Sequence, residues 1–254
     1  MWKARFFFTV GLVCLLALPL LAQEKPGNVA TATYVKPKPG MRQQFEQANK
    51  RHMEWHRQQK DTWTINVWEV ISGEHIGQYG YATVGHHWKD FDARAKFDEA
   101  DMADYMANVA QYVDLESNTY WIHHPDQSRP LPGDAPIQLY EAVRYHLNVD
   151  GESDFLLTGR KILEAIQKTN YPVYYEAYEL WDGGEHPTYL LIFPHKNWAD
   201  FEPPEQTFPA MLEKAFGRDE AESLMKLSSK SIHCVHSEVW VARPDLGYVP
   251  PAAK

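Results

Sequence analysis

The sequence predicts an α+β protein in which two tandem ferredoxin-like β-α-β-β-α-β units form one intramolecular α/β barrel. The first observation is an internal repeat, since six residues between positions 67 and 91 recur 110 positions later. A period of this size suits a domain, so each copy should own a core and the two should pack as a pair. The second observation is that apolar residues alternate in some segments and recur every three or four residues in others, as strands and helices require. The repeated residues are Glu69, Gly73, Tyr79, Trp88, Asp90 and Phe91, matched by Glu179, Gly183, Tyr189, Trp198, Asp200 and Phe201.

The first unit is expected over residues 28–126. Its first helix carries apolar residues at alternating spacings of four and three, which places them on one stripe. The strands are rich in β-branched and aromatic residues and end at turns that contain Gly or Pro. The expected elements are strands over 30–35, 62–70, 78–84 and 119–123, a helix over 41–59, and a helix after Trp88 with an apolar face of Met102, Tyr105, Met106, Val109 and Tyr112.

A proline-rich linker over 127–136 separates the two units. The second unit is expected over 137–245, and it is nine residues longer than the first between Phe201 and Trp240. The extra residues are assigned to a loop at 202–205. Its expected elements are strands over 137–147, 174–180, 188–193 and 231–241, a helix over 155–168, and helical residues after Trp198.

Residues 1–22 are typical of a secretory signal peptide. Lys3 and Arg5 precede an apolar run over 6–18, and the small residue Ala22 lies just before a change to polar sequence. We therefore expect cleavage after Ala22, export to the periplasm or the medium, and no stable membrane association afterwards. The cleaved chain would keep one cysteine, Cys234, and so could form no internal disulfide.

The charge balance argues against nucleic acid as a partner. Cleavage would leave 23 basic against 34 acidic side chains, a formal charge of −11. Nucleic acids require a concentrated basic face, and the sequence contains no run of Lys or Arg. A small-molecule ligand is the expected partner, in a monomer with a pseudo-dimeric barrel or in a higher homo-oligomer.

The two-unit pattern resembles the dimeric α/β-barrel superfamily, and within it the NIPSNAP and antibiotic-biosynthesis-monooxygenase group. The resemblance is carried by segment 34–40 followed by Phe45, and by the segment at 88–91 with its repeat at 198–201. It covers nearly all of the chain beyond the signal peptide. Members of this superfamily include cofactor-free monooxygenases, haem degraders, isomerases and proteins without a known reaction, so the fold does not choose among these functions.

The same resemblance implies where a haem ligand would lie. Haem-degrading members carry an axial histidine about three turns into the second helix after its Trp. Here those places hold Asp98 and Phe208, and neither helix contains a histidine. The sequence therefore predicts no haem of this kind and no other cofactor.

Two histidines on the first helix are candidate functional residues. His52 and His56 lie one helical turn apart, and the repeat aligns them largely with aliphatic residues of the second unit. Three roles remain open, namely hydrogen-bonded structural histidines, a base or ligand-binding group in a pocket, and metal ligands. No third ligand can be identified, so no metal is predicted.

A second polar group is predicted on two strands of the second unit. Arg144 and His146 share a strand face, as do His236 and Glu238, because residues two apart point the same way. If these side chains face the barrel, they could hold a carboxylate or a phenol, with Arg144 binding the anion and a histidine exchanging a proton. If they face outward, they are ordinary surface charges, and the sequence slightly favours this.

The leading functional prediction is an exported protein that binds a small aromatic or hydrophobic molecule. The pocket is expected between the first unit's sheet and helices, where His52 would be the catalytic base beside Trp55, His56 and Trp63. Cofactor-independent oxidation or isomerisation is the chemistry that such a pocket could support. The alternative is a non-catalytic extracytoplasmic binding or scaffold module of the same fold.

Overall fold

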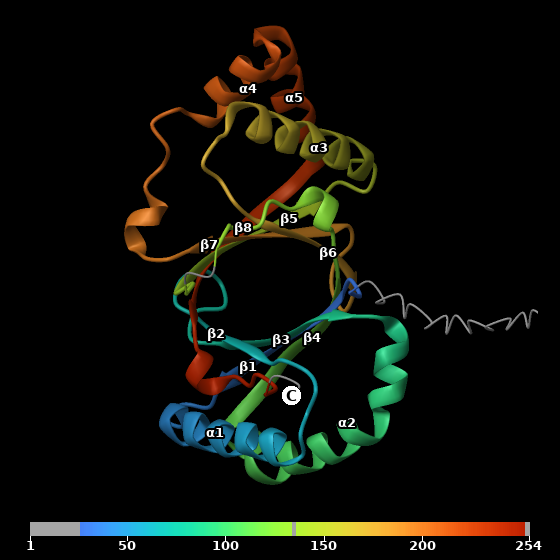
Figure 1. Cartoon of the computed structure of the whole chain (residues 1–254), viewed down its shortest axis with the longest axis vertical. Coiled ribbons are helices and arrows are strands. Elements are labelled where there is room, and N and C mark those ends of the chain that lie inside the picture. Colours follow the sequence, from blue (N-terminus) through green and yellow to red (C-terminus); the bar gives the residue numbers. More distant parts are fainter. Residues whose placement is uncertain (1–25, 134–135, 252–254) are drawn as a thin grey trace, which may run out of the picture.

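The computed structural model describes residues 26–133 and 136–251 and shows an α+β barrel with helices outside it. The expected signal peptide over 1–22 lies outside the described residues. In Figure 1 the barrel occupies the middle of an elongated molecule, and helices cover it at the two opposite ends. Within the described part of the chain, no helix combines the length and the apolar character needed to cross a bilayer.

Each half of the chain contributes four strands to the barrel. The first half contains β1 (Val29–Pro37), α1 (Arg42–Gln58), β2 (Asn66–Val70), β3 (Tyr79–His86), α2 (Trp88–Asn108) and β4 (Val113–His123). The second half contains β5 (Leu139–Leu147), α3 (Glu152–Thr169), β6 (Glu176–Asp182), β7 (Thr188–His195), α4 (Phe208–Phe216), α5 (Arg218–Ser231) and β8 (Ile232–Ala242).

All strand pairs of the barrel are antiparallel, and the strand order is β1-β3-β2-β8-β5-β7-β6-β4. The halves meet at two seams, where β2 pairs with β8 through Trp68–Val70 and β4 pairs with β6 through Tyr120–His123. The predicted α+β class and barrel are thus confirmed. Descent of the two halves from one duplicated segment stays a prediction.

The core has three parts, one inside the barrel and one beneath the helices of each half. Alternation along the strands separates them, because neighbouring side chains point to opposite faces of the sheet. The inner cluster contains Ala30, Tyr34, Trp68, Val70, Trp121, Ala142, Leu180, Leu190 and Trp240. The outer clusters are centred on Phe45 and Tyr79 under α1, and on Ile166 and Met211 between α3 and α4.

The predicted apolar face of α2 is right in part, because Tyr105, Val109 and Tyr112 pack in the core cluster under α1, the last two just beyond the end of the helix. Met102 and Met106 are 57% and 61% exposed, and no residue of α2 is buried. The side chains that α2 turns toward α1 include Arg94, Phe97 and Asp101, which contact residues of α1 or of the loop after it. The side of this helix that faces α1 therefore combines polar and aromatic side chains, and only the two methionines were placed wrongly by the hydrophobic pattern.

Where the first half has the single helix α2 starting at Trp88, the second half has a 3₁₀ turn at Trp198–Phe201 and two helices, α4 and α5. In both halves the repeated aspartate satisfies a free backbone N–H near the start of the helical segment. His87 N donates to Asp90 Oδ2 at 2.7 Å, and Lys196 N donates to Asp200 Oδ2 at 2.7 Å. The repeated Asp thus has a local structural role.

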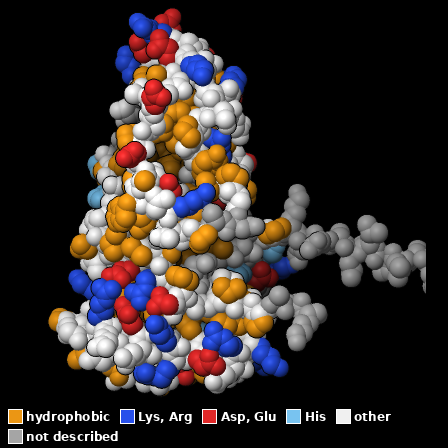
Figure 2. All heavy atoms as spheres, turned by 60° about the vertical axis from the view of Figure 1, so that its left-hand side comes forward, with side chains coloured by type: hydrophobic (Ala, Val, Ile, Leu, Met, Phe, Trp, Pro, Cys, Tyr) orange, Lys and Arg blue, Asp and Glu red, His pale blue; other side chains and the backbone are white. Residues whose placement is uncertain are grey.

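Charged side chains of both signs are mixed toward the two ends of the molecule. Figure 2 shows hydrophobic side chains across the middle of one face, between these ends. Lys and Arg do not gather into one continuous patch on that face. The view agrees with the expectation that nucleic acid is not a partner, which stays a prediction.

Candidate functional site

A cavity of about 720 Å³ lies inside the barrel. Its wall is largely apolar, because alanines at inner strand positions leave space that the aromatic residues around them do not fill. The short side chains are Ala30, Ala32 and Ala82, and the aromatic ones include Tyr34, Trp68, Trp121, Tyr140, Tyr178 and Trp240. Residues at the end of the linker and in the C-terminal segment, among them Pro136 and Tyr248, complete the wall.

Three of these aromatic rings pack together in one cluster on the cavity wall. Trp68 and Trp240 stack with centroids 4.6 Å apart, and Tyr34 meets each of them edge-on at 5.7 and 6.5 Å. Offset and edge-to-face ring contacts of this kind are favourable beyond the area they bury. The Nε1 atom of Trp68 is buried and has no hydrogen-bond partner among the described residues. The wall therefore offers mainly aromatic ring surface.

Polar groups enter the barrel beside this surface. Arg144 lines the cavity, and Glu238 is 3% exposed and accepts a hydrogen bond from Trp240 Nε1 at 2.9 Å. His75 Nδ1 also contacts the Glu238 carboxylate. Burial raises the pKa of Tyr34, and the Coulombic attraction of Arg144 opposes that shift. Tyr34 is therefore a neutral hydroxyl at neutral pH.

The strand pairing shows which way the second polar group points. Arg144 lies opposite His236, and His146 lies opposite Cys234. Because Arg144 lines the cavity, the residues that alternate with it on β5 and β8 share the inner face of the barrel. The outward orientation that the sequence slightly favoured is therefore wrong. The sequence could not show which face is inside, because both faces of β5 carry polar and aromatic residues.

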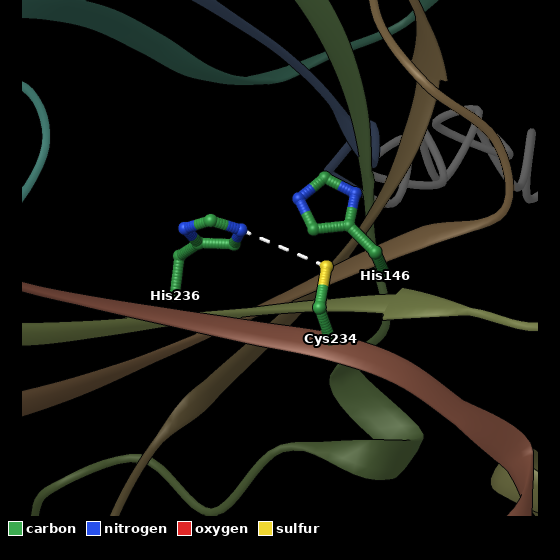
Figure 3. Close-up of side chains that lie close together, drawn as sticks. All are labelled: His146, Cys234 and His236. Carbon is green, nitrogen blue, oxygen red and sulfur yellow. Dashed lines mark hydrogen bonds between the residues drawn. The ribbon is translucent and has the colours of Figure 1, made fainter.

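His146, Cys234 and His236 form a group that could hold a metal ion. Figure 3 shows the three side chains projecting from β5 and β8 toward one another, with the Cys234 Sγ atom 3.6 Å from His236 Nε2. His146 Nδ1 is already within 2.9 Å of the Thr188 hydroxyl. Burial lowers the pKa of His146. This group is more exposed than the histidines of α1, because His236 is on the surface.

The other predicted site residues lie outside the barrel, between α1, α2 and the loop that follows α1. His52, Trp55, His56 and Trp63 do not line the barrel cavity. Their rings fill the space between the helices: His52 and Trp55 stack at 5.9 Å, and Trp63 stacks on the ring of His86 at 3.6 Å. Large aromatic side chains therefore occupy the region where the sequence analysis expected a pocket, and the space lies inside the barrel instead.

His52 and His56 do come together, with a partner that the sequence analysis missed. Both Nε2 atoms approach Oδ1 of Asp101 on α2, at 3.1 and 3.2 Å. Asp101 was missed because it belongs to another helix, where no local spacing connects it with α1. Asp98, at the place where the resemblance put a haem-binding histidine in other proteins, instead pairs with Arg94 Nε at 2.7 Å.

The comparisons with known proteins identify the fold. No family model matches the chain, and no curated protein matches it. A candidate monooxygenase from Lactobacillus acidophilus NCFM superposes with a TM-score of 0.56 at 8% identity, over 91% of this chain and 99% of that one. A chlorite dismutase from Candidatus Nitrospira defluvii, in complex with imidazole, gives 0.55 at 7% identity, over 87% and 93%. A candidate monooxygenase from Fusobacterium nucleatum gives 0.52 at 9% identity, over 85% and 93%.

These observations define an α+β barrel protein with a hollow, aromatic interior. Its structural neighbours share this α+β barrel fold over most of their length, so the fold part of the sequence-based resemblance is confirmed. At such low identity the likeness carries the fold alone, and function has to be argued from the site.

Proposed function

We propose that the barrel cavity binds a small aromatic or hydrophobic molecule. The observation that carries this proposal is the cavity itself, whose volume of about 720 Å³ falls within the usual range for small-molecule sites. The stacked Trp68 and Trp240 rings offer a face for an aromatic ring, and Arg144 offers a positive charge for a phenolate or carboxylate.

The chemistry that we propose for this site is cofactor-independent, monooxygenase-like oxidation. Two structural neighbours described as candidate monooxygenases support it at the level of the fold. Arg144 would favour the anionic, electron-rich form of the substrate, and Glu176 in the cavity wall would take up the proton. Conversion of a ring CH₂ to C=O by O₂ releases one water, so this reaction balances without an external reductant. Isomerisation through the same anion, and binding without turnover, are the alternatives.

Ligand binding tests the proposal most directly. A panel of phenols and naphthols is titrated against the tryptophan fluorescence of the protein, since three tryptophans line the cavity. Ala82→Phe should fill part of the cavity and weaken binding at least tenfold, and Arg144→Met should weaken anionic ligands selectively. His52→Leu is the matched control, because His52 lies outside the barrel. Unchanged affinity in a folded Ala82→Phe variant, or lost affinity in His52→Leu, would contradict the barrel site.

Turnover is tested separately from binding. Oxygen consumption with each bound ligand, followed by mass spectrometry of the product, distinguishes oxidation from the two alternatives. A product of unchanged mass indicates isomerisation. Saturable binding without a product indicates a non-catalytic module.

We further propose that the chain is exported after cleavage behind Ala22, on the pattern of residues 1–22. Intact-mass measurement of the exported protein should give a chain that starts at Gln23, and a mass that retains residues 1–22 would exclude this cleavage.

We also propose that the halves are copies of one NIPSNAP-like unit. Their equivalent strand orders, β4-β1-β3-β2 and β8-β5-β7-β6, support a duplication. Separate superposition of the two halves is the test, and halves that do not superpose would contradict it.

A further inference from the structure

Two imidazoles and a carboxylate converge between α1 and α2, outside the barrel. We propose that His52, His56 and Asp101 bind one divalent transition-metal ion, for which Zn²⁺ is the natural probe. The three candidate ligand atoms all lie within 4.8 Å of one another. This site is separate from the barrel cavity and does not depend on the function proposed for that cavity.

The hydrogen bonds of the two imidazoles leave a place for a cation between their Nε2 atoms and Asp101 Oδ1. His52 Nδ1 lies 2.8 Å from Asp104 Oδ2, and His56 Nδ1 lies 2.8 Å from Asp61 Oδ2. An ionised carboxylate can only accept a hydrogen bond, so each Nδ1 carries the proton, and in the neutral form of each ring the lone pair of Nε2 turns inward. Both lone pairs then face Asp101 Oδ1. Three electron-rich atoms repel one another unless a metal ion, or a proton on an imidazole, lies between them.

The geometry favours a shared ion over direct hydrogen bonds. Asp101 Oδ1 is buried and makes no hydrogen bond with good geometry within the described residues, although it lies 3.1 and 3.2 Å from the two Nε2 atoms. Ligand atoms about 2.0–2.1 Å from a tetrahedral Zn²⁺ are about 3.3 Å apart. Asp101 Oδ1 lies at about this separation from both Nε2 atoms, but in an orientation that does not suit a hydrogen bond. This is the position expected for the third ligand of one shared metal ion.

The surrounding carboxylates match the outer shell of known histidine-metal sites. Ligating histidines almost always donate their other N–H to a carboxylate, a carbonyl or water, which fixes the ring and raises its basicity. Here Asp104 accepts such a hydrogen bond from His52 Nδ1, and Asp61 accepts one from His56 Nδ1. Asp61 is in turn held by both terminal nitrogens of Arg94, at 2.5 and 2.8 Å. The two rings are thus oriented before any ion arrives.

The charge around the site also favours a cation. This cluster contains one guanidinium, that of Arg94, and four carboxylates, which leaves three negative charges in excess while the imidazoles are neutral. The carboxylates are those of Asp61, Asp98, Asp101 and Asp104. A divalent ion would compensate most of this excess. Burial, with the nearby Asp101 and Asp61 charges adding to it, raises the pKa of Asp98 even though Arg94 lowers it.

An ion has a route into the site and a structural task there. The histidine side chains are 6% and 1% exposed, whereas that of Asp101 is 27% exposed, so the open side lies at the carboxylate. Since no residue of α2 is buried, polar contacts and partly buried rings hold that helix against α1. A metal ion would join the two helices directly and leave one coordination position for water.

Zinc binding to the chelator-treated protein tests this inference. The Cys234→Ser variant is the starting protein, because it removes the competing His146, Cys234 and His236 group. We expect it to bind one Zn²⁺ per chain in a competition titration with a fluorescent chelator, and to unfold at a higher temperature with Zn²⁺ present. Co²⁺ should give the visible absorption of a four- or five-coordinate site. Adding Asp101→Asn should weaken Zn²⁺ at least 100-fold, and adding Asp104→Asn should weaken it about 10–100-fold.

Three results would overturn the inference. The first is a Cys234→Ser protein that binds no Zn²⁺ at micromolar concentration, which would mean that a proton on an imidazole fills the gap. The second is stoichiometric binding that Asp101→Asn leaves unchanged. The third is a Co²⁺ spectrum of purely octahedral, solvent-like character. Asp101 is partly exposed and Asn has the same shape, so circular dichroism can verify that the variant is folded before zinc is added.

Discussion

Replacing Asp61 with alanine should destabilise the protein by about 3 kcal/mol. The Asp61 side chain is 0% exposed and accepts four hydrogen bonds, two from Arg94, one from His56 Nδ1 and one from the backbone N–H of Trp63. Removing one partner of a buried ion pair typically costs about 3–5 kcal/mol, because the remaining charge stays buried. Arg94 is only 10% exposed but keeps Asp98, so we expect the lower end of that range.

Urea unfolding in the presence of a chelator measures this loss without any contribution from bound metal. Glu54→Ala is the matched control, since the Glu54–Arg57 pair on α1 is exposed and its loss should cost at most about 0.5 kcal/mol. A loss below about 1 kcal/mol for Asp61→Ala, with unchanged dependence on urea, would refute the idea that this ion pair supports the α1–α2 region.

The same pair gives a pH dependence with a definite sign. Burial alone would raise the pKa of Asp61, but hydrogen bonds from Arg94, His56 and the Trp63 backbone outweigh it and hold the pKa well below the usual value. The stabilisation is therefore fully present above the unfolded-state pKa, about 3.9, and is lost as the pH falls below it. The difference between the parent protein and Asp61→Ala should therefore shrink as the pH falls below about 4, where the unfolded chain binds a proton at Asp61 that the folded chain does not.

Two further predictions concern the barrel and its helices, and thermal unfolding checks both. Gly80→Ala should cost about 1–3 kcal/mol, because the new Cβ would lie 2.1 Å from the Trp68 ring, whereas Gly159→Ala on α3 meets nothing within 4 Å and should gain about 0.5–1 kcal/mol. Equal effects of the two changes would contradict the close contact. Glu238→Ala should cost about 1–3 kcal/mol, because the buried Trp240 Nε1 loses its acceptor; a neutral result would mean that water replaces the carboxylate.

The order of helices and strands could be predicted because the spacing of apolar residues along the sequence differs between helices and strands. The helix expected over 41–59 is α1 (Arg42–Gln58), and the strand expected over 30–35 is β1 (Val29–Pro37). The expected strand over 62–70 starts later, at Asn66, because the preceding residues form the loop that holds Asp61 and Trp63. Local patterns specify such elements well and their ends less well.

The location of the cavity could not be predicted, because periodicity shows which residues share a face but not which face is inside. On β5 one face carries Tyr140, Ala142, Arg144 and His146, and the other carries Glu141, Val143 and Tyr145. Neither is clearly the more apolar, so the inner face is identified only by the strands that pair around the barrel. The same limit hid Asp101, whose contact with α1 depends on tertiary packing alone.

Every strand of the described barrel has a hydrogen-bonded neighbour on both sides, and this closure limits how a small molecule can enter the cavity. A sheet with free edges could admit a molecule sideways by fraying an outer strand, but a closed ring of strands offers no such lateral gate. A guest must pass through one of the two ends. The end of the linker and the C-terminal segment, with Pro136 and Tyr248, form part of the cavity wall, so these two segments also shape the access to the cavity.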